Sequence, residues 1–301
     1  MQGLTNRALR SYFIEQVKPD VVFTEFMRVN AAATVKRLSK ADLREIASTE
    51  ERVPLVVQLV GHGAEALVSA ARAAQAAGAV HINLNMGCPY GRMTSGLTGG
   101  GMLKRPADIA AIIRPLRDTV AGSFSVKIRA GYDDPEQIFS LLPLFESAGV
   151  NFLVLHPRTV VQEYSGTADH SITARVVQET KLPVIANGDI RSSADGERLL
   201  KETGAAGLML GRGAIADPLL FERLRGRASL SVSPEEQLRE LRFYLREMTV
   251  RYCELFCGEM QVLGKLKAIV SQMDNQVQGK TVKELKKAKT LRSFEALISS
   301  S

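Results

Sequence analysis

The chain has 301 residues, of which 45% are hydrophobic and 24% charged, as expected of a globular protein with one large or two ordinary domains. This composition excludes a mainly disordered, collagenous or coiled-coil protein, and no apolar run reaches the length of about 18 residues that a membrane span needs. The first residues do not resemble an export signal, and Cys88, Cys253 and Cys257 lack zinc-ligand spacing. We therefore expect a cytoplasmic protein with reduced thiols and no metal.

Short, β-branched apolar runs alternate with helix-like segments over about 210 residues. The runs are apolar on both faces, which is typical of strands buried in a parallel sheet. The predicted strands are Val21–Thr24, Leu55–Val60, Val80–Leu84, Phe124–Ile128, Phe152–Leu155, Val184–Ala186 and Gly207–Leu210. The predicted helices between them are Glu65–Ala77, Pro106–Asp118, Pro135–Ser147, Ile172–Thr180 and Ala194–Thr203, with Gly78, Gly149 and Gly204 ending three of them. Seven strand–helix units predict an α/β fold, a (β/α)₈ TIM barrel that lacks its first strand.

The missing strand falls at the start of the chain. Thr5 is a suitable N-cap for a helix over Asn6–Val17, so only Met1-Gln2-Gly3 is left of the first strand and its loop. We expect either that the numbered chain begins late or that the barrel closes without a regular first strand. In the first case, a version extended upstream is expected to bind its ligand more tightly and to be more stable.

A helical domain is predicted after the barrel. Ser233 as N-cap and Pro234 at the first helical position begin it, and helix-forming segments broken near Gly258 and Gly279 continue to Leu297. We expect residues 1–228 to form the barrel and residues 229–301 the helical domain. Eight basic and two acidic residues between Lys265 and Arg292 give a net charge of +6, nearly the whole +7 of the chain. Such a run is either a solvated helix face or a phosphate-binding surface.

Polar residues stand within or directly after each predicted strand, where active sites of such barrels lie. Glycine-rich turns follow the last two strands, at Asn187-Gly188-Asp189 and Gly211-Arg212-Gly213, and are typical of phosphate binding. Lys127 lies inside a strand and requires an anionic partner, either a flavin or a carboxylate such as Glu25. Cys88 precedes a proline and a glycine-rich loop, which favours a nucleophile or general acid over a buried packing residue.

At these residues the sequence resembles the tRNA-dihydrouridine synthase family. The ordered motifs that carry the resemblance are Asn85-Met86-Gly87-Cys88-Pro89, Val126-Lys127-Ile128-Arg129, His156-x-Arg158-Thr159, Tyr164-x-Gly166, Asn187-Gly188-Asp189 and Gly211-Arg212-Gly213. They span nearly the whole barrel. Pro157, where the family usually has glycine, and Arg92, where lysine is common, depart from the pattern.

The resemblance implies an FMN enzyme that reduces a uridine in the D-loop of tRNA to 5,6-dihydrouridine, with NADPH, or NADH in its place, as reductant. It implies that Cys88 is the general acid. The residues implied to contact FMN are Met1, Gln2, Gln58, Lys127, His156, Asn187, Gly188, Asp189, Gly211 and Arg212. The residues implied to contact tRNA are Glu25, Asn85, Arg92, Arg158, Tyr164, Lys265, Lys267 and Gln272, with Asn85 on the flipped base.

The segment Thr24–Val29 is similar to the bacterial branch of the family that acts on uridine 16, so that position is the expected target. The expected partner is tRNA, bound by a monomer through the basic helical domain, with no membrane and no metal. Two other classes stay open. A small-molecule FMN oxidoreductase of the dihydroorotate or dihydropyrimidine type explains the barrel but not the basic helices. A non-catalytic tRNA-binding protein predicts no flavin.

Overall fold

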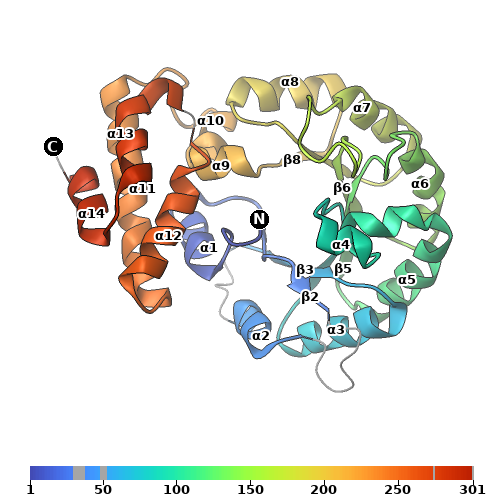
Figure 1. The fold of residues 1–301 in the computed structure, drawn as a ribbon. Helices are drawn as coiled ribbons and strands as arrows, with labels where there is room; N and C mark the ends of the chain where they lie inside the picture. The colour runs from blue at the N-terminus through green and yellow to red at the C-terminus, as the bar shows by residue number, and fades with distance from the viewer. Residues whose placement is uncertain (30–37, 48–52, 274, 300–301) are drawn as a thin grey trace. The chain divides into compact units, whose positions relative to one another are not determined.

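The computed structural model describes residues 1–29, 38–47, 53–273 and 275–299 (Figure 1). Its chain forms two compact units. The barrel unit comprises Val21–Ile190 and Asp195–Leu210, and the helical unit comprises Met1–Asp20, Arg191–Ala194 and Gly211–Ser301. No helix in the described ranges is long and apolar enough to cross a membrane.

A single parallel sheet forms the centre of the barrel unit. Its strands are β1 (Val22–Phe23), β2 (Met27–Arg28), β3 (Leu55–Val60), β4 (His81–Met86), β5 (Ser123–Arg129), β6 (Phe152–His156), β7 (Val184–Asn187) and β8 (Gly207–Met209). The order is β1-β3-β4-β5-β6-β7-β8, and β2 also pairs with β3. Because β1 and β2 pair with the two ends of β3, they occupy one strand position, interrupted in the middle. All seven predicted strands are therefore present, and the TIM-barrel-type α/β fold is confirmed, with β1 and β8 as unpaired edges among the described strands.

Helices cover the outside of this curled sheet, as Figure 1 shows for α3, α5, α6 and α7. The helices of this part of the chain are α2 (Lys40–Ala47), α3 (Ala64–Ala76), α4 (Gly91–Ser95), the 3₁₀ helix η2 (Gly99–Lys104), α5 (Pro106–Thr119), α6 (Gln137–Ser147), α7 (His170–Glu179) and α8 (Ser193–Thr203). The three predicted helix-ending glycines Gly78, Gly149 and Gly204 have φ of 103°, 75° and 68°, as a left-handed C′ residue requires.

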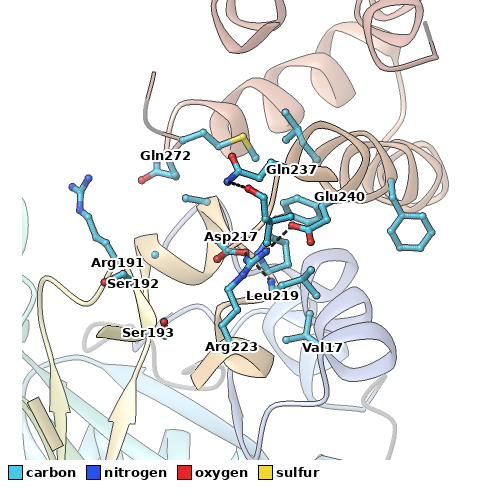
Figure 2. A pocket seen from close by; sticks show the side chains of 18 of the residues that line it. Val17, Arg191, Ser192, Ser193, Asp217, Leu219, Arg223, Gln237, Glu240 and Gln272 are labelled. Carbon is cyan, nitrogen blue, oxygen red and sulfur yellow. Dashed lines mark hydrogen bonds and ion pairs between the residues drawn. The ribbon is translucent and has the colours of Figure 1, made fainter. Parts of the chain in front are cut away.

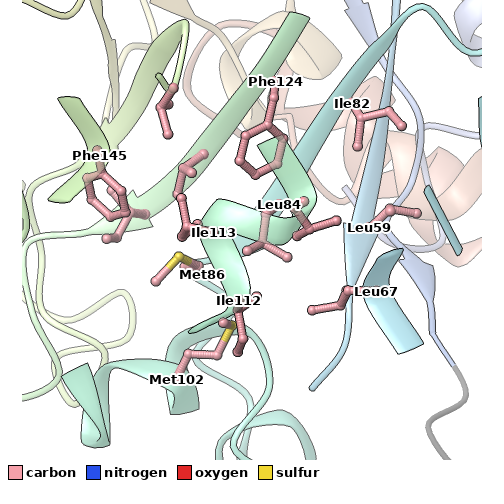
Figure 3. Close-up of a cluster of buried hydrophobic side chains, with 14 of the residues drawn as sticks. Leu59, Leu67, Ile82, Leu84, Met86, Met102, Ile112, Ile113, Phe124 and Phe145 are labelled. Atoms are coloured by element: carbon pink, nitrogen blue, oxygen red, sulfur yellow. The ribbon is translucent and has the colours of Figure 1, made fainter. Parts of the chain in front are cut away.

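The apolar core between sheet and helices is formed by the outward-facing side chains of the strands. Figure 3 shows Leu59, Ile82 and Phe124 from the strands beside Leu67 of α3 and Ile113 of α5. Each of these side chains is at most 1% exposed. Full burial of such a side chain contributes about 1.5–3 kcal/mol. The core therefore holds the strands in the register that places their carboxyl ends at one edge.

The helical unit contains α1 (Arg7–Tyr12), the π-helix η1 (Phe13–Val17), α9 (Arg212–Ala216), α10 (Leu220–Leu224), α11 (Pro234–Leu255), α12 (Glu259–Val270), α13 (Asn275–Lys287) and α14 (Leu291–Ser299). Ser233 forms the predicted cap of α11, as a capping box with Glu236. Two predictions are wrong. Asn6, not Thr5, caps the first helix, because its side chain accepts from the Leu9 amide. Gly279 lies inside α13 rather than at a break.

Helix α1 belongs to the helical unit. Its Tyr12 ring lies 4.9 Å from that of Tyr244 on α11, and Arg251 of α11 forms an ion pair with Glu15. Lys265 of α12 donates to the carbonyl of Gly3 over 2.9 Å. The contacts therefore place Met1–Asp20 and Gly211–Ser301 in one unit, which differs from the predicted boundary between residues 228 and 229. That the part before this boundary is catalytic and the part after it binds tRNA stays a prediction.

Candidate active site at the carboxyl end of the sheet

A ladder of side-chain amides crosses strands β3, β4 and β5 inside the sheet. Gln58 donates to Asn83 over 2.9 Å and accepts from Asn85 over 2.9 Å, and Asn83 donates to Ser125 over 2.9 Å. All four side chains are buried. Buried polar groups are costly unless paired, so the ladder fixes both Gln58 and Asn85. Asn83 and Ser125 were not predicted, although the alternation of asparagine with apolar residues along β4 indicates an inward polar face.

The turn that carries Cys88 is held by Asn85. The Asn85 Oδ1 atom accepts from the amides of Gly87 and Cys88, over 3.1 and 3.0 Å. On the other side, the Gly100 amide donates to the Cys88 carbonyl over 2.9 Å. Cys88 is 7% exposed. The thiol is therefore fixed at the end of β4 rather than on a free loop, and Asn85 acts on the turn that carries it.

The glycine-rich loop approaches Cys88 too closely for side chains. A Cβ atom on Gly100 would lie 2.6 Å from Val160 Cγ2 and 2.8 Å from the Cys88 carbonyl oxygen. We expect Gly100→Ala to lower the free energy of unfolding by about 1–3 kcal/mol, because a well-packed site cannot take an added methyl group. Chemical denaturation measures this. Gly91→Ala, where a Cβ meets nothing within 4 Å, is the matched control, and equal loss in both variants would contradict the packing of this loop.

Lys127 on β5 is partly buried and donates from Nζ to Asn187 Oδ1 on β7 over 2.9 Å. Burial, and then the charge of Arg129, lowers the pKa of Lys127 to about 8, although the nearby Cys88 opposes this shift. Asn187 donates in turn to the Met209 carbonyl over 2.8 Å. Within the described ranges, no ion pair joins Lys127 to Glu25, the carboxylate considered from sequence. An anion bound beside Lys127 would favour its charged form.

His156, Arg158 and Asp189 form one cluster, in which the first two are buried and Asp189 is exposed. Arg158 makes a two-pronged pair with Asp189, over 3.0 and 2.6 Å, and donates from Nη1 toward His156 Nε2 over 3.2 Å. Burial and the charges of Lys127, Arg129 and Arg158 hold the pKa of His156 far below its usual value. His156 is therefore neutral, and because its Nε2 accepts, its proton lies on Nδ1. Burial alone raises the pKa of Asp189, but hydrogen bonds from Arg158 and an amide outweigh it and lower this pKa.

The Arg158 guanidinium is buried and forms hydrogen bonds within the protein. It is 2% exposed and also donates to the carbonyls of Ser165 and Gly166, over 3.1 and 2.7 Å. The predicted tRNA-contact residue thus orders the loop around Tyr164. Gly188 lies against the same cluster: a Cβ there would approach His156 Nε2 to 3.2 Å, and its φ of 127° favours glycine.

A second buried guanidinium, Arg129, joins the Cys88 turn to the loop that carries Tyr164. It donates to the Gly87 carbonyl over 2.9 Å, and to the carbonyls of Thr159 and Glu163 over 2.7 and 2.6 Å. Its guanidinium lies 5.3 Å from the centre of the Tyr164 ring. The sequence placed Arg129 on a strand without a role; its burial at 1% exposure marks it as a positioning residue.

Four predicted cofactor residues lie in the helical unit. A Cβ on Gly211 would lie 3.7 Å from Met1 Sδ, so the first residue and the turn after β8 are neighbours. Gly211 caps α9, which begins at Arg212. Gln2 is exposed, and the Met1 amino group donates to Thr5 over 2.7 Å.

The helical unit also contains a pocket of about 560 Å³, shown in Figure 2. Arg191 and Ser192 line it together with Gln272, and Arg212 also lines it. On another side, Arg223 forms ion pairs with Asp217 and with Glu240. Arg212 and Gln272, predicted from different motifs, therefore share one pocket.

The remaining predicted tRNA residues have varied environments. Glu25 is partly buried, and its Oε1 atom has no hydrogen-bond partner in the described structure. Lys265 donates a hydrogen bond to the Gly3 carbonyl, and Gln272 donates to the Ala268 carbonyl over 3.4 Å. Lys267 is partly exposed on α12. The backbone of Arg92 lies in α4, but its side chain is outside the described structure.

No group of three histidine, cysteine or acidic side chains suited to a metal ion occurs among the described residues. The titratable groups at the carboxyl end of the sheet include instead a thiol, an ammonium and a neutral imidazole. Such a set, on a parallel barrel sheet, is typical of an α/β-barrel enzyme.

Comparison with known proteins agrees with this class. The family model for dihydrouridine synthase (Dus) matches residues 1–299. The tRNA-dihydrouridine(16) synthase of Cupriavidus necator is 32% identical over 259 residues, covering 83% of this chain and 80% of that protein. The enzyme of the same name from Pseudomonas putida is 35% identical over 224 residues, covering 72% and 69%. This chain belongs to the dihydrouridine synthase family, and the predicted family is confirmed.

Solved structures at lower identity share the fold. TcOYE in complex with pHBA has a TM-score of 0.56 at 13% identity, covering 76% of this chain and 86% of its own. Morphinone reductase in complex with tetrahydroNAD has a TM-score of 0.54 at 14% identity, covering 76% and 84%.

Proposed function

We propose that this chain reduces a D-loop uridine of tRNA, uridine 16, to 5,6-dihydrouridine, with FMN as its resident flavin and NADPH as the reductant. Family membership supports the reaction class, and two relatives carry uridine 16 in their names. The observation that carries the proposal is the fixed Cys88 turn beside the partly buried Lys127, at the same end of adjacent strands. We also propose that the chain acts on tRNA in the cytoplasm and as a monomer.

The residues of the barrel unit fit a flavin. Lys127 is a partly buried ammonium whose described partner is the neutral Asn187 amide, so it needs an anionic or strongly accepting group. The N1–C2=O edge of a flavin is such a group, and it becomes negative on reduction. Gln58 and His156, with a proton on Nδ1, supply further polar contacts to the ring. The glycine at 188 leaves room against His156.

In the barrel unit, the turn after β7, Asn187-Gly188-Asp189, is the proposed source of backbone amides for the flavin phosphate. In the helical unit, Gly211 and Arg212, with Met1 next to Gly211 and Gln2 after it, keep the cofactor contacts that the family resemblance implies.

Cys88 holds the proton that the uracil ring needs. When bound, the reduced flavin supplies a hydride to C6 of the base. Cys88 then donates its proton to C5, and Asn85 keeps the thiol in position through the amides of Gly87 and Cys88. Asn85 Nδ2 uses one of its two hydrogens for Gln58, which leaves one for the flipped base. Glu25, whose Oε1 atom is buried and unpaired, is a further acceptor for that base.

Helix α13 and its C-terminal end supply the surface for the tRNA backbone. Lys280, Lys283 and Lys287 are exposed at helical spacing, whereas Val282 and Leu285 are buried. Lys289 and Arg292 extend the exposed charge beyond the helix. A solvated basic stripe of this kind attracts phosphates by releasing counterions. Lys267 adds to it from α12, whereas Lys265 stabilises the N-terminal turn.

A comparison of substrates distinguishes the proposed function from the two alternatives, a small-molecule oxidoreductase and a non-catalytic RNA-binding protein. The purified chain, loaded with FMN, is given NADPH and either unmodified tRNA, free uridine or dihydroorotate. We expect reduction of tRNA alone. Turnover of the small molecules without tRNA would identify a small-molecule oxidoreductase, and absence of flavin binding would identify a non-catalytic RNA-binding protein.

Flavin affinity should depend on pH through Lys127. In the flavin-free protein its pKa is lowered to about 8, so the ammonium form that the flavin prefers is lost as the pH rises through that value. Binding then takes up a proton, and we expect the affinity to fall about tenfold between pH 7 and pH 9. Fluorescence titration of FMN measures this. Lys127→Met should bind more weakly with no such dependence, and equal wild-type affinity at both pH values would contradict the role of Lys127.

A further inference from the structure

Two tyrosines form an exposed aromatic pair beside the Cys88 turn. Tyr90 is 59% exposed and Tyr164 is 44% exposed, and the neighbouring Tyr164 raises the pKa of the Tyr90 hydroxyl. Tyr90 is separated from Cys88 only by Pro89 and is the residue before α4. Large exposed aromatic side chains are suited to stacking on a ligand.

The buried side chain of Arg129 contacts Tyr164. The Arg129 guanidinium lies 5.3 Å from the centre of the Tyr164 ring. The same guanidinium donates to Gly87 beside Cys88. Tyr90, Tyr164 and the thiol are therefore connected through one fixed side chain, and the tyrosines hold a set position relative to the reacting end of Cys88.

Tyr90 lies outside the buried position that Cys88 occupies. Cys88 is 7% exposed, whereas Tyr90, two residues further, is largely open to solvent. A base whose C5 reaches Cys88 must enter the buried end, so the tyrosine ring is left for a group that stays at the rim. In a polynucleotide that group is the neighbouring nucleotide, whose base is unstacked when the target base leaves the stack.

We propose that Tyr90, beside Tyr164, stacks on the unpaired base next to the uridine whose C5 meets Cys88. This inference rests on the proposed function. Stacking on an aromatic ring is tolerant of base identity, so Tyr90 contributes affinity and keeps the flanking nucleotide out of the pocket rather than reading its sequence.

The test compares Tyr90→Ser with Tyr90→Phe in the full chain loaded with FMN. Binding of unmodified tRNA is measured by fluorescence anisotropy at fixed salt. Loss of one stacked base is worth about 1–3 kcal/mol, so we expect affinity to fall about 5- to 150-fold in the serine variant. The phenylalanine variant keeps the ring and should remain within about threefold of wild type.

Val80→Ser is the matched control, because Val80 is also 59% exposed but precedes β4 at the opposite end of that strand. It should bind tRNA and FMN as wild type does. Equal FMN content and melting temperature in the Tyr90 variants would show that the site is intact.

A tRNA that lacks the base beside the target uridine completes the comparison. Wild type should bind this abasic tRNA about as weakly as Tyr90→Ser binds intact tRNA, and the serine variant should lose little more. Additive losses, or a serine variant that binds intact tRNA normally, would overturn the stacking role. Failure of the wild type itself to bind or reduce tRNA would instead refute the proposed function.

Discussion

Replacing Cys88 by alanine should leave a protein that binds flavin normally and reduces tRNA about 10²–10⁴ times more slowly, the usual loss for a missing general acid. The thiol is small, so its removal creates little space, and the Cβ and backbone atoms of Cys88 that lie against Gly99 and Gly100 are kept in alanine. Its turn is held by backbone amides that donate to Asn85, and these do not depend on the sulfur. Dihydrouridine formed per enzyme in single turnover gives the rate, and the flavin spectrum gives cofactor content.

The control for this variant is Cys253→Ala, because Cys253 is an exposed thiol on α11. It should keep the wild-type rate. A Cys88→Ala enzyme that forms dihydrouridine as fast as wild type would contradict the assignment of the proton to this residue. A rate loss accompanied by loss of flavin would point to disruption of the fold at this turn instead.

The second large effect is expected on tRNA binding, when three lysines of α13 are replaced by glutamate. We expect Lys280→Glu, Lys283→Glu and Lys287→Glu together to weaken tRNA binding on the order of 100-fold at low salt. The slope of log affinity against log salt concentration should fall by about one for each tRNA phosphate that a lysine no longer neutralises. All three side chains are exposed, so the fold and the flavin content should not change.

An equal change of net charge elsewhere separates local contacts from general attraction. Lys40, Lys181 and Lys201 are exposed in the barrel unit, and their reversal to glutamate is the matched control. We expect the control to lose far less affinity and to keep the salt slope. Equal losses in both triple variants would show that α13 has no special part in binding tRNA.

Sequence predicted the sheet well because its strands are buried on both faces. Leu55–Val60 was predicted to the residue, and every other predicted strand is present with ends shifted by at most two residues. The interruption between β1 and β2 was missed, since pairing with β3 rather than local pattern defines it. The π-helix at Phe13–Val17 was likewise predicted as ordinary helix, because the two have similar composition.

The site was predictable in its residue types but not in their partners. Motifs identified Cys88 and Lys127, yet no sequence pattern shows that Arg158 pairs with Asp189 or that Lys265 reaches Gly3. Those contacts join residues 31 and 262 positions apart. Whether a basic side chain faces a solvent phosphate or an internal carbonyl depends on tertiary packing, which the local sequence does not contain.

The most direct measurement is the mapping of dihydrouridine in tRNA from a bacterial host that lacks all its own dihydrouridine synthases and expresses this chain. Mass spectrometry of nuclease fragments locates the modified base. We predict a gain of two mass units on the fragment containing uridine 16, and none when Cys88→Ala is expressed instead. Dihydrouridine at another D-loop position would contradict the choice of uridine, and tRNA without dihydrouridine, from cells that contain the folded flavoprotein, would contradict the function.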